Sequence, residues 1–542
     1  DTNGGDLTIN GVGAAFQSGS AQTVSTGGGI IDINGEVSLS NTAGVTLNSG
    51  GGNIDISGRV NSGNSYSISN SPDSWTDAKS SYGGDGSDGN AYLITITGPL
   101  ENALAGNVLT DNDIDTAWTA GNDTGTEGTW VWAAGPEQGE KFFVGDRSGS
   151  TDAKIGFFDI PGVGQTFLAW NAGEPNNSGD EDALEFGFGD SDLWNDNNTP
   201  NEKYLLLETE LDPSSLVLDA GGGTVTIGGG VGTSKALASL DVTASSTTVN
   251  GNGLVTTAAQ NYSGALTVNN SGPIRLDGSI DAGGDIVVDA ADGGVDVRAD
   301  LSTTSGSNGD ITLTGQGGTD SGGGQIGIQI ADGADLSADG NGNILLDGTG
   351  GDSSGDGNHG VAIAGSSTLS TGGGDIRLQG IGSGTGGSSL NDGLQINDLG
   401  VSAAGGAITL DGGTDHGSTS SESIAFETGH SPAIGDGSQS GSISLIGDTF
   451  YFGSKPTLQT SGAIVVESSG STFGQALDTG DLTISGTPSA LTVGKSSNTS
   501  NVTVATEITV DGPISFFGGG VSLNNNLTTT DSSVGDIAIT TT

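Results

Sequence analysis

Most of the chain alternates apolar and polar residues in short runs that begin just after a glycine. Five such runs are GDITLTG (309–315), GNILLDG (342–348), GDIRLQG (374–380), GAITLDG (406–412) and GSISLIG (441–447). A period of two places successive side chains on opposite faces of an extended backbone. Each run therefore predicts a short β-strand with one buried face.

The spacing of these runs is nearly constant, because their first isoleucines recur every 32–35 residues. A second strand often lies between two runs, as in GQIGIQI (324–330). Coils of constant length that stack their Ile, Leu and Val side chains define a parallel β-solenoid. A string of β-sandwich domains is the alternative, disfavoured because residues 211–542 contain no Trp.

The middle of the chain differs in composition, because all six Trp and four of the six Tyr lie there. The pattern predicts helices over 71–81 and 98–109, with a strand over 92–97 between them. The second helix would bury Leu100, Leu104 and Val108 on one face. The fold class is thus mainly β, with three predicted parts: N-terminal solenoid coils (1–64), an inserted α+β domain (65–210) and the main solenoid (211–542).

The amino-acid composition excludes several classes of function. The net charge of −53 excludes a nucleic-acid binder that relies on backbone phosphates. The absence of Cys excludes disulfides, thiol catalysis and Cys-ligated zinc, and no apolar run approaches the roughly 20 residues that span a bilayer. A Cys-free acidic chain is commonest outside the cell, although a cytosolic protein can share this composition. Because the chain contains no Met, even at position 1, we expect it to be part of a longer precursor.

The candidate functional side chains lie between residues 111 and 203, a segment rich in Asp, Glu and Asn. Glu174, Glu181, Asp182 and Asp196 would repel one another in a partly buried site unless a hard cation joined them. Carboxylate and amide oxygens without His or Cys favour Ca²⁺ over transition metals. The residues therefore predict a calcium site.

The motifs EPN (174–176), ED (181–182) and WND (194–196), preceded by GTW (128–130), resemble those of a C-type lectin-like domain. The resemblance implies that a primary Ca²⁺ is held by Glu174, Asn176, Glu181, Asn195 and Asp196. In that family sugar hydroxyls complete the coordination, so these five residues are also the implied carbohydrate ligands. The EPN form implies mannose-type sugars, including glucose, N-acetylglucosamine and fucose, and disfavours galactose.

The same resemblance implies further details. An auxiliary Ca²⁺ would be held by Asp123, Glu127, Asn177, Glu181 and Asp182. The Glu174–Pro175 bond would be cis. The family's disulfide positions fall on Ala183 and Leu207, as in bacterial members that lack the bridges, and the stretch between Trp132 and Trp170 is expanded. Some lectin-like domains bind protein or nothing, which stays an alternative.

The flanking repeats resemble filamentous haemagglutinin-like, right-handed parallel β-helices of bacterial surface proteins. That resemblance implies an exported adhesin or fibre. Strand-like segments near residue 7 and at 536–542 carry no cap. Such ends are completed by more solenoid in a longer parent or by head-to-tail stacking of copies into a filament, unless the chain is a fragment with frayed ends.

An enzyme is not expected. His359, His416 and His430 are scattered, as expected of surface or corner residues, and the solenoid has few basic residues. The stretch 83–93 predicts a loop rather than a calcium-binding roll, and an ice-binding Thr ladder is a remote third reading. The leading hypothesis is an extracellular adhesin whose solenoid displays a Ca²⁺-dependent, mannose-type lectin domain. The alternative is a subunit of an extracellular filament in which that domain is decorative or makes subunit contacts.

Overall fold

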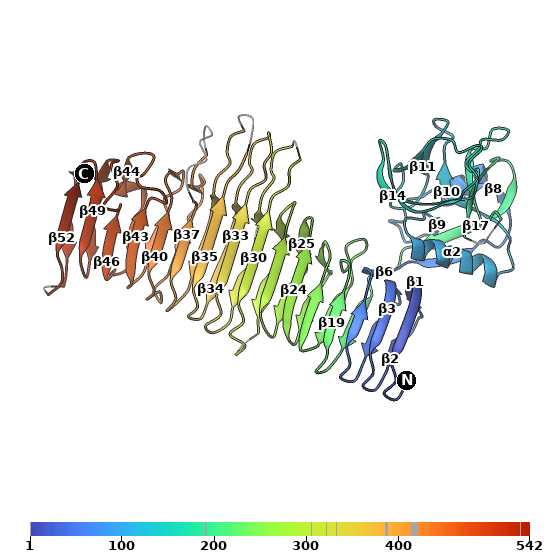
Figure 1. Cartoon of the computed structure of the whole chain (residues 1–542), viewed down its shortest axis with the longest axis horizontal. Coiled ribbons are helices and arrows are strands. Elements are labelled where there is room, and N and C mark those ends of the chain that lie inside the picture. Colours follow the sequence, from blue (N-terminus) through green and yellow to red (C-terminus); the bar gives the residue numbers. More distant parts are fainter. Residues whose placement is uncertain are drawn as a thin grey trace.

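The computed structural model describes residues 2–189, 192–304, 306–320, 322–331, 333–384, 388–413, 421–531 and 533–542. It consists of a long stack of β-coils and a compact domain beside the N-terminal end of that stack (Figure 1). The stack is built from long parallel sheets, as a β-solenoid requires. The predicted solenoid architecture agrees with this arrangement, whereas its right-handedness stays a prediction.

The first long sheet runs the whole length of the stack (Figure 1). Its strands are β1 (Leu7–Gln17), β3 (Ile31–Ser40), β5 (Ile54–Ile56), β6 (Val60–Ser62), β19 (Thr224–Ile227), β21 (Ser246–Val249), β24 (Ala265–Asn270), β27 (Ile286–Ala290), β30 (Ile311–Gln316), β33 (Ile344–Thr349), β35 (Ile376–Ile381), β37 (Ile408–Asp411), β40 (Ile443–Ile446), β43 (Ala463–Glu467), β46 (Ala490–Val493), β49 (Ile514–Gly518) and β52 (Ile537–Thr541).

A second long sheet follows the first along the stack. Its strands are β2 (Gln22–Ser25), β4 (Val45–Asn48), β18 (Ser215–Asp219), β20 (Ser239–Thr243), β22 (Gly253–Val255), β23 (Gln260–Tyr262), β25 (Ile274–Asp277), β26 (Ile280–Ala282), β28 (Val295–Val297), β29 (Leu301–Thr303), β31 (Ile328–Ile330), β32 (Leu336–Ala338), β34 (Val361–Thr371), β36 (Leu394–Ser402), β38 (Ile424–Phe426), β39 (Ala433–Ile434), β41 (Phe450–Phe452), β42 (Thr457–Gln459) and β45 (Thr483–Ser485). Near the C-terminus two small sheets complete the coils, with β44 (Leu477–Asp478), β47 (Val502–Val504), β50 (Val521–Leu523), β48 (Ile508–Val510) and β51 (Leu527–Thr529), beside the short helix η1 (Thr479–Asp481).

The isoleucine spacing read from the sequence is the stacking repeat of the first sheet. Successive register partners are Ile311, Ile344, Ile376, Ile408 and Ile443. Each of them is at most 1% exposed, so they form one buried column. Removing this apolar surface from water is the main stabilising contribution to the stack.

A second column explains why Asp or Asn precedes three of these isoleucines, Ile311, Ile344 and Ile376. The backbone nitrogens of Asp310, Asn343 and Asp375 each donate to the side-chain oxygen of the equivalent residue one coil earlier, at 2.9, 2.7 and 2.8 Å. The side chain at each corner thus satisfies a backbone donor of the next coil. This contact fixes the register between coils as well as their spacing.

The compact domain interrupts the chain without interrupting the stack. Leu216 of β18 pairs with Val45 of β4, and Val225 of β19 pairs with Ile54 of β5. Coils on either side of the insertion therefore pack directly on each other. The buried apolar core of the solenoid draws on residues 16–60 and 216–516, and a separate core draws on residues 75–207.

This inserted domain is α+β, and its two helices lie beside a mixed sheet (Figure 1). Trp118, Trp130, Trp132 and Trp170, expected in the core, are each at most 3% exposed. The elements are β7 (Ser65–Ile68), β8 (Asp73–Ser74), α1 (Trp75–Tyr82), β9 (Tyr92–Leu93), α2 (Pro99–Asp111), β10 (Ala117–Asn122), β11 (Thr129–Trp132), β12 (Lys141–Val144), β13 (Lys154–Ile160), β14 (Gly164–Trp170), β15 (Ala183–Phe186), β16 (Trp194–Asn197) and β17 (Glu202–Thr209).

The predicted buried face of the second helix is wrong in part. Ala105 and Leu109 are at most 1% exposed, whereas Leu104 and Val108 are only partly buried. The helix α2 packs on the domain's own core with one face and approaches β1 of the solenoid with another, and Leu104 lines the cavity between them. A helix covered on two sides shows no single apolar stripe in its sequence.

The strand predicted over 92–97 is also shorter than expected. Only Tyr92–Leu93 forms a strand, but Ile94 continues the contacts on both sides. Its backbone nitrogen donates to the Leu206 carbonyl at 3.0 Å, and its carbonyl accepts from the Ala120 nitrogen at 2.9 Å. The segment is therefore anchored between β10 and β17 although its pairing is irregular.

Polar contacts join the domain to the solenoid where the chain leaves and returns. The Ser214 nitrogen donates to Ser62 Oγ at 2.9 Å, and Ser40 Oγ donates to the Asn64 carbonyl at 2.7 Å. Lys235 Nζ lies 2.5 Å from Glu210 Oε2. The two chain passages are thus held to the stack and to each other.

One of the histidines, expected at the surface or at a corner of a coil, is buried. His359 is 5% exposed, and its Nδ1 accepts a hydrogen bond from the Asp392 nitrogen at 3.2 Å inside a stacked loop. His416 lies outside the described residues. Within the described chain, no helix is both long and apolar enough to cross a membrane.

Candidate metal and carbohydrate site

The candidate site lies in the loop that precedes β15 and on the neighbouring strand β16. The Glu174–Pro175 bond is cis, as the resemblance implied. Asn195 and Asp196 belong to β16, which pairs with β15 so that Asn195 lies opposite Glu185. The sheet therefore places the WND residues, whereas a loop places the EPN residues.

Backbone hydrogen bonds bring the EPN and WND motifs together. The nitrogens of Asn176 and Asn177 donate to Asp196 Oδ2 at 2.9 and 2.6 Å. The side-chain amide of Asn176 donates to Glu174. The other carboxylate oxygen of Asp196, Oδ1, is buried without a hydrogen-bond partner, and Asp196 is 1% exposed. A buried carboxylate oxygen left unpaired is costly unless a cation takes it, so this residue suits a metal ligand.

Burial and the neighbouring charges raise the pKa of two carboxyls in this group, Glu174 and Glu181. Burial, followed by the nearby Asp196 carboxylate and by repulsion from Glu181, raises the pKa of Glu174 to about 7. Burial and the Asp196 charge also raise the pKa of Glu181. Glu181 is tied to the same loop, since its nitrogen donates to Asn177 Oδ1 at 2.8 Å. A bound cation would offset the repulsion that helps to raise the pKa of Glu174 and Glu181.

Asn195 is oriented by a residue that the motifs did not reveal. Its Nδ2 donates to Glu185 Oε2 at 3.0 Å, which leaves its carbonyl oxygen as the atom suited to a cation. Burial alone would raise the pKa of Glu185, but hydrogen bonds from Lys203, Asn197 and Asn195 and the Lys203 charge lower it. Lys203 Nζ lies 2.5 Å from Glu185 Oε1. The sequence signal was a single carboxylate in the apolar strand ALEF (183–186).

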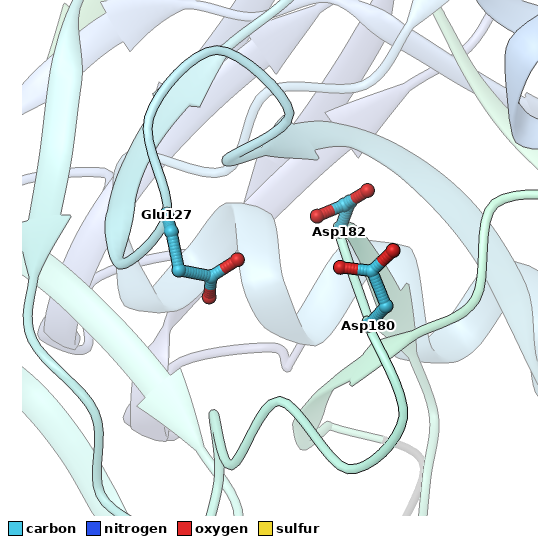
Figure 2. A group of neighbouring side chains, drawn as sticks. All are labelled: Glu127, Asp180 and Asp182. Atoms are coloured by element: carbon cyan, nitrogen blue, oxygen red, sulfur yellow. The ribbon is translucent and has the colours of Figure 1, made fainter.

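A second acidic group lies beside the first, and its membership differs from the predicted auxiliary set. Carboxylate oxygens of Glu127, Asp180 and Asp182 lie within 4.8 Å of one another. Figure 2 shows Glu127 on one loop facing Asp180 and Asp182 on another. Asp180 was not among the predicted ligands. Asn177 and Glu181, which were, lie on the same loop and hydrogen-bond to each other.

Asp123 lies between the two groups. It is 3% exposed, its Oδ2 accepts from the Gly128 nitrogen at 2.8 Å, and its Oδ1 is buried without a partner. Burial, with repulsion from Glu127, Asp182 and Asp196, raises its pKa to about 6. The second unpaired buried carboxylate oxygen therefore also lies at a position predicted to bind Ca²⁺.

Another collection of acids lies at the junction with the solenoid. Glu101, Glu208 and Glu210 line a cavity of about 260 Å³ there. Each accepts hydrogen bonds from neighbouring side chains, as when Tyr92 Oη donates to Glu210 at 2.8 Å. In the described part of the chain, Glu127, Asp180 and Asp182 make up the one acidic group with metal-ligand spacing.

Comparisons with known proteins find similarity to C-type lectins and to halomucin. No protein-family model matches the chain. The chain is 32% identical over 142 residues to C-type lectin domain family 4 member M of Hylobates lar, covering 26% of this chain and 27% of that protein. It is 29% identical over 198 residues to halomucin of Haloquadratum walsbyi, covering 34% of this chain and 2% of halomucin.

Solved structures of C-type lectins give distant matches. The lectin CEL-I from Cucumaria echinata matches with 18% identity and a TM-score of 0.20, over 27% of this chain and 90% of that one. The carbohydrate-recognition domain of the mouse scavenger receptor C-type lectin matches with 18% identity and a TM-score of 0.19, over 27% and 88%. The chain spans about a quarter of the curated lectin's length and a small fraction of halomucin.

Proposed function

We propose that this protein is an extracellular adhesin in which the β-solenoid displays a Ca²⁺-dependent, mannose-type carbohydrate-binding domain. The observation that carries the proposal is the buried, unpaired Oδ1 of Asp196, beside Glu174 and Asn176. Oxygen ligands alone, supplied mainly by loops, suit the coordination of Ca²⁺. The protein is thus proposed to bind a glycan rather than to catalyse a reaction.

Glu174, Asn176, Glu181, Asn195 and Asp196 would hold the primary ion. Asp123, Glu127 and Asp182 would hold the auxiliary ion, joined by Asp180 because of its position in the structure. The lectin similarity supports sugar hydroxyls as the remaining ligands of the primary ion. Mannose-type selectivity rests on the residue order EPN, and the surface location rests on the acidic, Cys-free composition and the solenoid.

Retention on immobilised mannose tests the proposal. With millimolar Ca²⁺ the purified chain is expected to be retained, to elute with a chelator, and to pass through a galactose column. Parallel equilibrium dialysis measures Ca²⁺ uptake. Uptake of Ca²⁺ without retention on any sugar column would contradict the lectin function and leave the metal site standing.

Self-association into an extracellular filament is a second candidate function, and the strand pairing that continues into β1 and β52 supports it. Ile537 extends the buried column of Leu491 and Ile514, yet Ile537 and Ile539 are 46% and 41% exposed. At the other end, Leu7 stacks on Ile31. A strand of this kind pairs with another coil, which either more of the same protein or a second copy of it can supply.

Sedimentation velocity over a range of concentrations tests this association. The wild type is expected to form longer rods as concentration rises. The double variant Ile537→Lys and Ile539→Lys is expected to stay monomeric, because it places charges on the stacking face. Thr540→Lys, on the alternate face of the same strand, is the control. A wild type that stays monomeric throughout would exclude association.

A further inference from the structure

The expanded stretch between Trp132 and Trp170 contains a residue that reaches the EPN turn. Arg147 follows β12 and lies in the loop that leads to β13. Its backbone nitrogen donates to the Pro175 carbonyl at 2.8 Å. Its Nη1 donates to the carbonyls of Glu174 and Asn171 at 3.2 and 3.3 Å. One residue thus binds three carbonyls of the turn that carries Glu174.

The rest of the guanidinium fixes the loop around itself. Nη2 donates to the Asp152 carbonyl at 2.6 Å and to Ser150 Oγ at 2.9 Å. The Ser150 nitrogen in turn donates to the Arg147 carbonyl at 2.8 Å. The planar fork of Arg supports several such directed bonds at once, which a Lys ammonium cannot reproduce in the same geometry.

The EPN turn is therefore held on two flanks by different groups. Arg147 donates to carbonyls of the turn, whereas Asp196 accepts from the backbone nitrogens of Asn176 and Asn177. Asp196 is also a proposed metal ligand, so the same carboxylate would contact both the turn and the cation. The contacts of Arg147 involve no proposed ligand side chain. These contacts therefore do not require a bound ion.

The geometry points to Arg147 as the positioning residue for the primary cation and sugar site, acting through the backbone of the Asn171–Pro175 segment. This inference rests on the proposed function and gives the expanded stretch a role in it. Because side chains that orient metal ligands affect affinity strongly, we expect Arg147→Ala to weaken Ca²⁺ binding by about 10–100-fold. Arg147→Lys should recover only part of that loss.

Two measurements test the inference. Equilibrium dialysis compares Ca²⁺ affinity in the wild type, Arg147→Ala and Arg147→Lys. Hydrogen–deuterium exchange without Ca²⁺ follows the amides of Asn176 and Asn177. Arg147→Ala should accelerate exchange there while leaving β17 protected as in the wild type. Arg275→Ala removes an exposed positive charge from the solenoid and is the control for net charge.

The outcomes separate the inference from the proposed function. Unchanged exchange at Asn176 and Asn177 in Arg147→Ala would overturn the positioning role, as would equal acceleration throughout the domain, which indicates general destabilisation. Ca²⁺ affinity equal to that of the wild type would overturn it as well. A wild type that takes up Ca²⁺ but binds no sugar would contradict the lectin function alone. A wild type that takes up no Ca²⁺ would contradict both.

Discussion

Asp196→Asn is expected to abolish Ca²⁺-dependent retention on mannose. The substituted amide keeps an oxygen that can accept from the nitrogens of Asn176 and Asn177, so the turn retains its shape. The variant loses the negative charge of an oxygen that is buried and unpaired. Because Ca²⁺ affinity follows the number of charged ligands, we expect the affinity for Ca²⁺ to fall by about 100-fold or more. Titration calorimetry with Ca²⁺ and retention on mannose measure the two effects.

The control for this variant is Asp159→Asn, which removes an equal charge from an exposed position on β13 of the same domain. It should bind Ca²⁺ and mannose as the wild type does. Asn195→Ala provides an independent test, since it removes the carbonyl oxygen and leaves Glu185 with Lys203 and Asn197. Sugar retention by Asn195→Ala or Asp196→Asn would place the site elsewhere.

The sequence was most informative where a feature repeats. The column from Ile311 to Ile443 could be predicted because each coil buries an equivalent residue at nearly equal spacing. Single contacts gave no such signal. Glu185 is one carboxylate in an apolar strand, and Arg147 binds backbone carbonyls, which leave no complementary side chain to find in the sequence.

For a related reason, the sequence does not predict which acidic residues belong to which of the two groups in the inserted domain. Asp180 and Glu181 are neighbours in sequence, but Asp180 joins Glu127 and Asp182, whereas the Asp196 charge acts on Glu181. Which of two adjacent carboxylates joins which group depends on the turn between 177 and 182. Asn177 and Asp180 both adopt positive φ there, of 50° and 72°. A motif fixes the order of such residues but not the direction of their side chains.

Calcium is expected to reverse the pH dependence of the inserted domain's stability. In the absence of cations the pKa of Glu174 is raised to about 7 and that of Asp123 to about 6. The folded state then holds these protons more tightly than the unfolded state. Stability is therefore greatest below the ordinary carboxyl pKa values of about 4 and falls as pH rises towards 7. With Ca²⁺, which binds the carboxylate form, stability should rise with pH instead.

Calorimetry at about pH 5 and pH 8, with chelator or with Ca²⁺, measures this reversal. At pH 8, free Ca²⁺ at 100 times its dissociation constant should stabilise the domain by about 2.7 kcal/mol. For a domain of about 150 residues that corresponds to a rise of about 5–11 °C in its melting temperature. The solenoid transition should not respond to Ca²⁺ in this way, because the proposed ligands all lie in the inserted domain.

The effect of Ca²⁺ on the pH dependence of stability distinguishes the proposed metal site from the acidic cavity at the junction with the solenoid. Burial raises the pKa of Glu101 to about 7 and that of Glu208 well above its ordinary value, so these carboxyls also destabilise the cation-free protein as pH rises. They belong to no proposed metal site, and Ca²⁺ should not reverse their contribution. Glu101→Gln should therefore flatten the slope measured with chelator and preserve the reversal, whereas Asp196→Asn should remove most of the reversal. A reversal that survives intact in Asp196→Asn would show that Ca²⁺ acts through other carboxylates.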